Sequence, residues 1–453
     1  MPKGSYSVIL KRGINSFNKT IEVDSDKSVS IRSFLIGAIS NGISEISNVL
    51  ESDDVYSTIR CLSKKLNIKI KKVGQKKYHI FGKGLGSLYP KKNSLLDFGN
   101  SGTCARLLIS ILSTTPGVKV RMTGDKSLCK RNMYGLIKIM NEFGADFYPK
   151  NKFNLPLKMV SSDMPLAIIY RAGVSSQLKS AVILASANAF GQSTITESKN
   201  LESRDHTENI LLKSSKILKI KKDKNKTIIK VSGKKYIDGL KYSVFGDPSS
   251  ASFHASMAML TPDSYLKIKN VGLNPKRIGF FRLMKMHGAK ITYKNVKKNK
   301  INELVGDVHV ESSRLRPIRA NTKIYPSMPD EYPISFVIAA LTPGTHVFKG
   351  ISELSNKESS RAQEMKKILN QVGVKCKLNK NEMKIFGTKK IKKKLIKVSN
   401  LGDHRICMSA TILALVASCP AYIKGFETVK TSSPNFLKTI KFLGGKFEIK
   451  KTS

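Results

Sequence analysis

Six short polar clusters, each rich in Ser, Asp, Asn or Gly, lead directly into runs of small and apolar residues. Anchored at positions 28, 101, 176, 249, 332 and 403, they recur at intervals of 73, 75, 73, 83 and 71 residues by subtraction. A polar cluster before an apolar run is typical of a helix N-terminus, where free backbone N–H groups can bind anions. Recurrence at a nearly fixed interval indicates an internal repeat. We therefore expect a scaffold that presents several helix N-termini to phosphates or carboxylates.

The elements that would position these clusters follow the same order in each repeat. The run after each cluster, such as 31–39 or 178–189, is apolar nearly all round, which is typical of a buried helix. A breaker pair such as Pro116-Gly117 follows, and then an amphipathic segment such as 136–143, which ends at Gly144. Alternating strands complete the repeat. The pattern predicts an α/β fold.

Six such repeats divide into two groups of three, and we expect two domains. The N-terminal strands around 6–10 and 19–23 have no repeat of their own, so we assign them to the C-terminal domain. That domain would comprise residues 1–24 and 246–453, and the N-terminal domain 25–245, with hinge crossings near 23–26 and 243–247. Each domain would contain three similar βαβαββ units with buried helices, an inverse α/β barrel-like arrangement. The polar clusters would face a cleft between the domains.

Composition narrows the class of protein. The 453 residues are 40% hydrophobic, which is ordinary for a globular protein of two or three domains. No apolar stretch of about 18 residues suggests a membrane span, and the N-terminus lacks a secretory signal pattern, so we expect a cytoplasmic protein without a membrane partner. Six dispersed cysteines form no CxxC pair and seven histidines no metal spacing, so neither a disulfide framework nor a metal site is expected.

The charge is unusual, because 80 basic minus 32 acidic residues gives +48. A nucleic-acid binder is one interpretation. However, the lysines largely alternate with apolar residues, as in 68–71, 217–221 and 374–377, which is typical of the outward face of half-buried strands. We therefore interpret the lysines as a solvated surface that attracts anionic substrates and expect no specific nucleic-acid partner.

The polar clusters also contain sequence motifs of a known family. The chain resembles the enolpyruvyl transferases, and within them the branch that acts on shikimate 3-phosphate. Nine ordered motifs spread over almost the whole chain carry the resemblance: DKSVSIRSF (26–34), GNSGTCARLL (99–108), TGDKSLCKR (123–131), VSSQLKSA (174–181), SRDHTE (203–208), GDPSSASF (246–253), MPDEYP (328–333), KESSR (357–361) and DHRICMSA (403–410).

The resemblance implies a reaction. Such enzymes transfer the enolpyruvyl group of phosphoenolpyruvate to the 5-hydroxyl of shikimate 3-phosphate by addition and elimination, a step toward chorismate and the aromatic amino acids. The family fold has two domains that close around the substrates. No metal or organic cofactor is implied, the partners are small anions, and the chain is expected to be a monomer.

The resemblance also assigns residues. Asp330, Glu358 and Lys27 are the expected proton-transfer groups; Asp330 would accept the proton of the 5-hydroxyl, and Lys27 or Glu358 would protonate the methylene carbon. Shikimate 3-phosphate is expected to contact Lys27, Ser28, Arg32, Ser175, Ser176, Gln177, Ser203, Asp330 and Lys357. Phosphoenolpyruvate is expected to contact Lys27, Gly102, Arg131, Gln177, Arg361 and Arg405, with Asn100, Arg106 and His404 as neighbours. Arginines suit such anions because the planar guanidinium binds carboxylate and phosphate bidentately.

Some positions depart from the family pattern. The usual run Arg-x-Lys-Glu-x-Asp-Arg reads Ser-Asn-Lys-Glu-Ser-Ser-Arg at 355–361, which removes local ion pairs but keeps Lys357, Glu358 and Arg361. The sister enzymes that use UDP-N-acetylglucosamine carry a reactive Cys before the position of Arg131, and Cys129 lies too close to Arg131 to match it. A binding module without catalysis, the remaining alternative, would have no need of Asp330 or Glu358.

Overall fold

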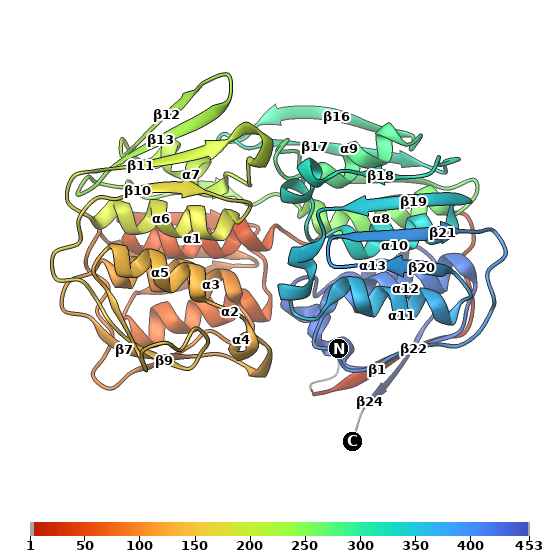
Figure 1. Ribbon diagram of the computed structural model, residues 1–453, viewed down its shortest axis with the longest axis horizontal. Coiled ribbons are helices and arrows are strands. Elements are labelled where there is room, and N and C mark those ends of the chain that lie inside the picture. The colour runs from red at the N-terminus through yellow and green to blue at the C-terminus, as the bar shows by residue number, and fades with distance from the viewer. Residues whose placement is uncertain (1–3, 452–453) are drawn as a thin grey trace. The chain divides into compact units, whose positions relative to one another are not determined.

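The computed structural model describes residues 4–451 and divides the chain into two compact units (Figure 1). Unit 1 comprises Met1–Asp24, Phe245–Lys297 and Leu304–Ser453, and unit 2 comprises Ser25–Val244 and Lys298–Glu303. The chain therefore passes between the units after residues 24 and 244, and again on either side of 298–303.

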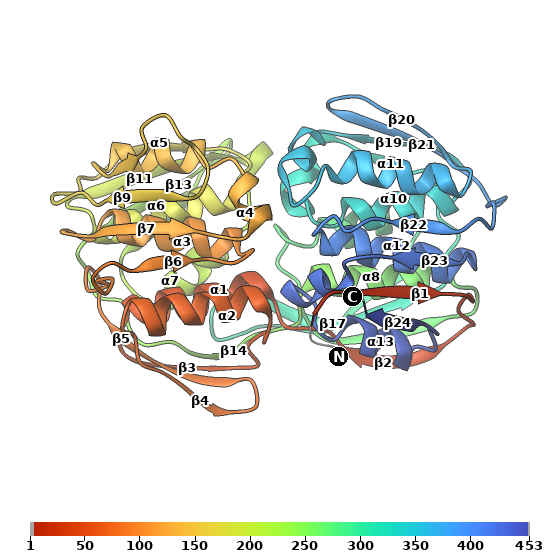
Figure 2. The ribbon, with the colours of Figure 1, turned by 90° about the horizontal axis from the view of Figure 1, so that it is seen from below.

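Three four-stranded sheets form the outside of unit 2 (Figures 1 and 2). In each sheet, taken in the spatial order that follows, the first two strands pair in parallel, and each later strand is antiparallel to the strand before it. In spatial order the sheets are β14 (Lys241–Ser243), β3 (Asn41–Ser47), β5 (Lys77–Lys83) and β4 (Ile70–Gly74); β6 (Leu95–Asp97), β7 (Lys119–Thr123), β9 (Leu157–Val160) and β8 (Asp146–Tyr148); and β10 (Ile169–Ala172), β11 (Gln192–Ser198), β13 (Lys226–Ser232) and β12 (Leu218–Lys222).

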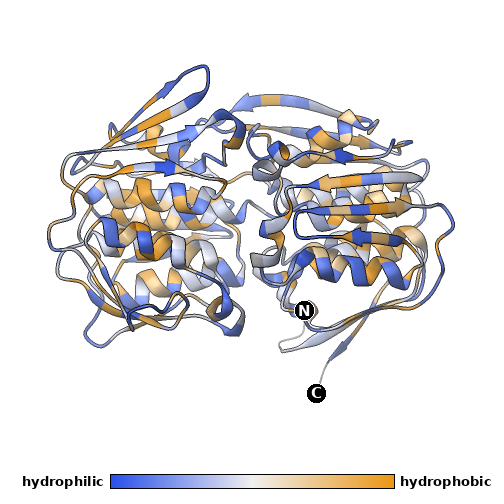
Figure 3. Ribbon diagram, in the orientation of Figure 1, coloured by the Kyte–Doolittle hydropathy of each residue, from blue (hydrophilic) through white to orange (hydrophobic). Residues whose placement is uncertain are grey.

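Three of the helices of unit 2 are buried over nearly their whole length: α1 (Lys27–Ile39), α3 (Gly102–Ser113) and α6 (Ser176–Asn188). Their apolar residues fill the space inside the sheets, as the hydropathy colouring shows (Figure 3). The remaining helices are α2 (Asp53–Arg60), which continues into a π-helical turn at Cys61–Lys65, α4 (Lys126–Lys130), α5 (Tyr134–Glu142) and α7 (His206–Ser214).

Unit 1 repeats this arrangement. Its sheets are β22 (Ile396–Val398), β23 (Ala421–Ile423), β1 (Tyr6–Leu10) and β24 (Glu448–Lys451); β16 (Ile291–Lys298), β17 (Leu304–Glu311), β15 (Tyr265–Gly272) and β2 (Asn18–Glu22); and β18 (Arg319–Ala320), β19 (Gly344–Lys349), β21 (Glu382–Gly387) and β20 (Lys375–Leu378). Strand β2 pairs in parallel with β15 but leads into α1 of unit 2, and β14 pairs in parallel with β3 but leads into the first helix of unit 1.

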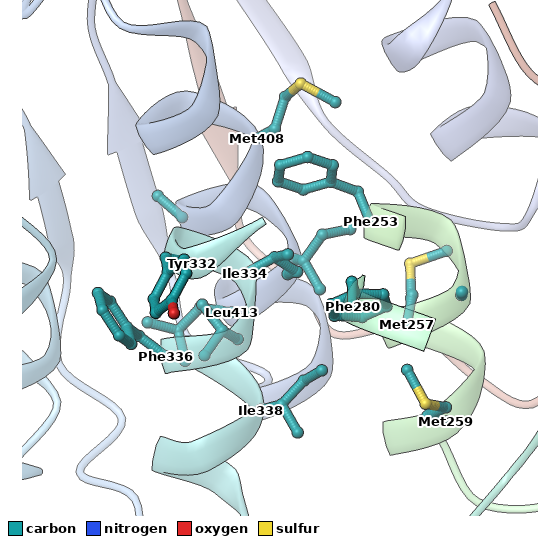
Figure 4. Close-up of a cluster of buried hydrophobic side chains, with 14 of the residues drawn as sticks. Phe253, Met257, Met259, Phe280, Tyr332, Ile334, Phe336, Ile338, Met408 and Leu413 are labelled. Atoms are coloured by element: carbon teal, nitrogen blue, oxygen red, sulfur yellow. The ribbon is translucent and has the colours of Figure 1, made fainter. Parts of the chain in front are cut away.

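The buried helices of unit 1 are α8 (Pro248–Leu260), α10 (Tyr332–Leu341) and α12 (His404–Ala417). The other α-helices are α9 (Gly279–Met286), α11 (Arg361–Gln371) and α13 (Phe436–Phe442). Their core includes Phe253, Tyr332, Phe336 and Leu413 (Figure 4). The rings of Tyr332 and Phe336 lie 5.9 Å apart in an edge-to-face arrangement. The mixed α/β architecture expected from the repeats is confirmed.

Local capping explains where most of the buried helices begin. The side chains of Asp26, Ser101, Ser175, Asp247 and Asp403 each accept a hydrogen bond from a backbone N–H of the first turn. Such caps satisfy N–H groups that have no partner within the helix. Helix α10 differs, because the carboxylate of Glu331, at its N-cap, accepts a hydrogen bond from Arg277 at 2.7 Å instead.

The lysine-rich strands have the surface orientation expected from their alternation. Lys219 and Lys221 of β12 are exposed, whereas Leu218 is buried. Among residues 4–451, none of the helices is long and apolar enough to cross a bilayer.

Candidate active site

The N-terminus of α1 carries three predicted site residues. Asp26 caps the helix by accepting a hydrogen bond from Val29 N at 2.8 Å. The next residue, Lys27, is mostly buried, and its ammonium lies 2.9 Å from Asp54 Oδ2 in the first turn of α2. Asp54 was not singled out from the sequence. Its carboxylate fixes the position of the lysine that we expect at the reacting carbon.

Arg32 lies one turn further along α1 and is 3% exposed. Its Nε donates to Thr207 Oγ1 at 2.8 Å, its Nη2 to Ser180 Oγ at 3.0 Å, and its Nη1 to the carbonyl of Ser28 at 3.1 Å. Burial lowers the pKa of Arg32 to about 10, partly opposed by nearby Asp26. The guanidinium therefore stays charged at neutral pH and is held by three separate segments.

The N-terminus of α3 brings two more predicted arginines together. Arg131 Nη2 donates to Asn100 Oδ1 at 2.9 Å, and Asn100 Nδ2 donates to Asp125 at 2.7 Å. Arg106 Nη1 donates to the carbonyl of Gly102 at 3.2 Å. A Cβ at Gly102 would lie 2.8 Å from Arg106 Nη1 and 2.9 Å from Arg131 Nη1. Glycine at this position thus allows two guanidinium groups to approach a helix N-terminus.

Helix α6 begins with three predicted ligands in sequence. Ser175 caps the helix, Ser176 is its first residue, and Gln177 donates from Nε2 to Thr103 Oγ1 of α3 at 2.9 Å. The side chain that we expect to touch both substrates is therefore oriented by the neighbouring helix. Thr103 belongs to the GNSGT motif, but its hydrogen bond with Gln177 depends on the packing of α3 against α6, which the sequence does not show.

Ser203 is fully buried, and its hydroxyl donates to Glu197 Oε1 at 3.0 Å. The backbone N–H of Ser203 donates to the same oxygen at 2.7 Å. A hydroxyl has one hydrogen. The predicted contact with a substrate phosphate therefore requires the Ser203 hydroxyl to change partner.

In unit 1, the predicted carboxylates converge on Arg361, at the start of α11 and 1% exposed. Arg361 lies 3.3 Å from Asp330 Oδ1, 2.6 Å from Glu358 Oε2 and 3.0 Å from Asp403 Oδ2. Burial alone would lower the pKa of the guanidinium, but the three carboxylates together raise it. Ser359, at an unrestricted position of the family run, donates its hydroxyl to Asp403 at 2.9 Å.

Arg405 lies in the first turn of α12 and is only 3% exposed. Within the described chain, its Nε and Nη1 have no hydrogen-bond partner, although its guanidinium carbon lies 5.7 Å from the centre of the Phe253 ring. Its backbone N–H donates to Asp403 at 2.9 Å. A buried arginine with unfilled donors is suited to an anion, because a burial cost this large normally requires a partner.

The other predicted residues of unit 1 lie on the same elements. His404 precedes Arg405 on α12, and its Nδ1 lies 3.5 Å from Thr431 Oγ1. Lys357 is half-buried at the end of the 3-10 turn Ser352–Asn356, immediately before Glu358. Each unit thus places many of its own predicted residues at or near helix N-termini.

Comparison with known proteins agrees with these motifs. A sequence profile of EPSP synthase (3-phosphoshikimate 1-carboxyvinyltransferase) matches residues 11–440. Proteins of that enzyme name are 34% identical in Paramagnetospirillum magneticum, covering 94% of both chains, and 36% identical in Caldicellulosiruptor bescii, covering 94% of this chain and 96% of the relative. The chain belongs to the EPSP synthase family. The EPSP synthase family resemblance read from the nine motifs is confirmed.

Solved structures support the same conclusion. EPSP synthase from Acinetobacter baumannii superimposes with a TM-score of 0.83 at 31% identity, covering 98% of this chain and all of that one. The enolpyruvyl transferase NikO from Streptomyces tendae has a TM-score of 0.75 at 11% identity, covering 99% of this chain and all of that one, and supports the fold alone. The similarity to the EPSP synthase family therefore extends over nearly the whole chain.

Proposed function

We propose that this EPSP synthase family member uses Asp330, Glu358 and Lys27 as the proton-transfer groups of its reaction. As a 3-phosphoshikimate 1-carboxyvinyltransferase, the chain transfers the enolpyruvyl group of phosphoenolpyruvate to shikimate 3-phosphate. The 5-hydroxyl adds to C2 of phosphoenolpyruvate while C3 takes a proton. The tetrahedral intermediate then loses phosphate and a C3 proton, which gives 5-enolpyruvylshikimate 3-phosphate.

Phosphoenolpyruvate would be held mainly by arginines. The observation that carries this part of the proposal is the pair of unfilled donors on buried Arg405. Two anionic groups of one small molecule require several cations in a confined space, and bidentate guanidinium contacts satisfy that requirement. Arg361 and Arg131, with Gly102 and Gln177, would complete the set together with Lys27.

Shikimate 3-phosphate would contact the N-termini of α1 and α6. Ser28, Ser175 and Ser176 supply hydroxyls at helix N-termini, where first-turn N–H groups lack partners within the helix, the usual chemistry of a phosphate site. Arg32 and Lys357 would contribute charge, and Ser203 a hydroxyl once it leaves Glu197.

Asp330 would act as the base toward the 5-hydroxyl. A carboxylate beside a buried guanidinium is kept in its charged form, which a proton acceptor requires. Lys27, held by Asp54, or Glu358 would deliver the proton to C3. Glu358 would first have to take up a proton, because the contact with Arg361 favours its charged form. The same groups would act in reverse during loss of phosphate.

The first test is phosphate release from phosphoenolpyruvate, with shikimate 3-phosphate and UDP-N-acetylglucosamine offered separately. Release with shikimate 3-phosphate alone supports the proposal. Release with the sugar nucleotide alone would contradict it in favour of the sister reaction. Arg405→Met should then raise the KM for phosphoenolpyruvate at least tenfold and leave the KM for shikimate 3-phosphate within a factor of two.

The chain would work as a cytoplasmic monomer, without a specific nucleic-acid partner. The exposed lysines on the strands support a general attraction for anions and no sequence-specific contact. Sedimentation at working concentration tests the monomer. Weak nucleic-acid binding that disappears steeply with added salt would agree with a diffuse charge effect.

A further inference from the structure

A buried ionic cluster lies beside the predicted phosphate ligands of unit 2. Lys179, in the first turn of α6, is fully buried, and its Nζ lies 2.9 Å from Glu197 Oε1 on β11 and 2.9 Å from Glu208 Oε1 on α7. Burial alone would lower the pKa of Lys179, but the two glutamates raise it well above its usual value. Burying three charged groups is costly unless close ion pairs and hydrogen bonds satisfy all of them.

The residue that the cluster holds is Ser203. Glu197 Oε1 accepts from the backbone N–H of Ser203 at 2.7 Å and from its hydroxyl at 3.0 Å. Lys179 Nζ donates to the carbonyl of Ser203 at 3.2 Å. Both polar atoms of this residue's backbone are therefore bound by charged side chains. Charge-assisted hydrogen bonds are about twice as strong as neutral ones, so the peptide is held firmly.

The two glutamates differ in this respect. Glu197 bonds both Lys179 and Ser203, whereas Glu208 forms an ion pair with Lys179. Each is at most 2% exposed, and each has a carboxylate oxygen 2.9 Å from the ammonium of Lys179. Substituting each glutamate in turn therefore separates the effect of losing a negative charge from the effect of losing the hydrogen bonds to Ser203.

We propose that Glu197, held by Lys179, is a positioning residue for shikimate 3-phosphate. It fixes the peptide of Ser203 and thereby the segment from Ser203 to the start of α7. This segment is then ordered before the substrate arrives. Lys179 lies three residues after Ser176 and two after Gln177, so the same cluster joins this loop to the N-terminus of α6. Ordering a loop in advance lowers the entropy cost of binding. The inference rests on the proposed contacts of Ser175, Ser176 and Ser203 with the phosphate.

The decisive experiment compares Glu197→Gln with Glu208→Gln in the full chain, with shikimate 3-phosphate titrated by calorimetry without phosphoenolpyruvate. Removal of a negative charge near a phosphate tightens binding if charge alone matters, and both variants would then bind more tightly. The positioning role predicts opposite behaviour. Glu197→Gln should weaken binding at least tenfold, and Glu208→Gln should stay within a factor of two. Steady-state kinetics should show the same rise in KM for shikimate 3-phosphate and an unchanged KM for phosphoenolpyruvate.

Equal effects of the two variants, or unchanged binding by a folded Glu197→Gln variant, would overturn the proposal. If wild-type protein itself does not bind shikimate 3-phosphate, the proposed function fails and the positioning role fails with it. Should Glu197→Gln not fold, hydrogen exchange on the wild-type protein decides. Residues 202–206 should be protected before substrate is added, and protection that appears only with substrate would overturn the proposal.

Discussion

Arg361 Nη1 lies 3.3 Å from Asp330 Oδ1, and the Nη2 of the same guanidinium lies 2.6 Å from Glu358 Oε2. One buried cation therefore contacts both carboxylates to which we assign proton transfer in unit 1. Asp403 binds the opposite side of Arg361 through Nε at 3.0 Å and fixes the group from α12. The geometry makes Arg361 an organiser of the acid–base groups as well as a candidate ligand of phosphoenolpyruvate.

Asp330→Asn should separate catalysis from binding. The amide keeps the shape and a hydrogen-bonding oxygen but cannot accept the proton of the 5-hydroxyl. We expect kcat to fall by about 10²–10⁴-fold, the usual contribution of general acid–base catalysis, with each KM changed less than about threefold. Exposed Glu353→Gln is the matched control and should leave kcat intact. Near-normal turnover of Asp330→Asn would remove this residue from the mechanism.

The ion pair between Lys27 and Asp54 gives a second prediction. Loss of the lysine in Lys27→Met should lower kcat/KM by about two to three orders of magnitude, since it removes a charge and a proton donor. Asp54→Asn leaves the ammonium present but unanchored, and we expect a smaller loss of about tenfold. Exposed Asp53→Asn, one residue away, should behave as wild type. If Asp53→Asn and Asp54→Asn are equally active, the 2.9 Å contact has no role in turnover.

Gly102→Ala should act on one substrate. The added Cβ would meet the guanidinium tips of Arg106 and Arg131 at 2.8 and 2.9 Å, and these flexible groups would have to move. We expect the KM for phosphoenolpyruvate to rise about tenfold, equivalent to about 1.4 kcal/mol, with a normal KM for shikimate 3-phosphate. Gly74→Ala, where the nearest side-chain atom is 3.6 Å away, is the control. An equal rise in both KM values would contradict a selective role.

Hydrogen bonds between residues close in the sequence made the starts of several helices predictable. Asp26, Asp247 and Asp403 each cap a helix within three residues of their own position, so the sequence alone marks where those helices begin. The repeat of these starts, followed by apolar runs, is enough to predict buried helices within sheets. The family motifs then supply the chemistry, since spacing alone does not reveal which anions are bound.

Pairings between distant segments were not predictable. Asp54 reaches Lys27 across 26 intervening residues, and Glu197 reaches Ser203 only because β11 turns through a short 3-10 segment. The hydroxyl of Ser203 was expected to face a substrate, yet the structure gives it a carboxylate partner. Such contacts depend on how helices and strands pack, and a single sequence contains no local signal for them.

A buried pair of His206 and Glu303 gives a prediction about stability and pH. His206 Nδ1 lies 2.7 Å from Glu303 Oε1, which also accepts from Asn209 at 3.0 Å. Burial alone would lower the pKa of His206, but the charge of Glu303 and its hydrogen bond raise it, with Asp26 adding to the rise and Arg32 opposing it. Burial would raise the pKa of Glu303, but His206 and Asn209 lower it. The pair therefore favours the charged form of both groups.

These shifts fix the direction of the pH dependence. The raised pKa of His206 contributes stability that is complete below the unfolded value of about 6.5 and is lost as pH rises through the folded pKa. The lowered pKa of Glu303 contributes stability above the unfolded value of about 4.3, which is lost as pH falls through the folded pKa. The stabilising effect should thus be greatest near pH 5.5. We expect the melting temperature of wild type relative to the His206→Gln/Glu303→Gln variant to decrease from pH 5.5 to pH 8, by about 2–4 °C per kcal/mol lost. A difference that is constant with pH would contradict the ionic character of the pair.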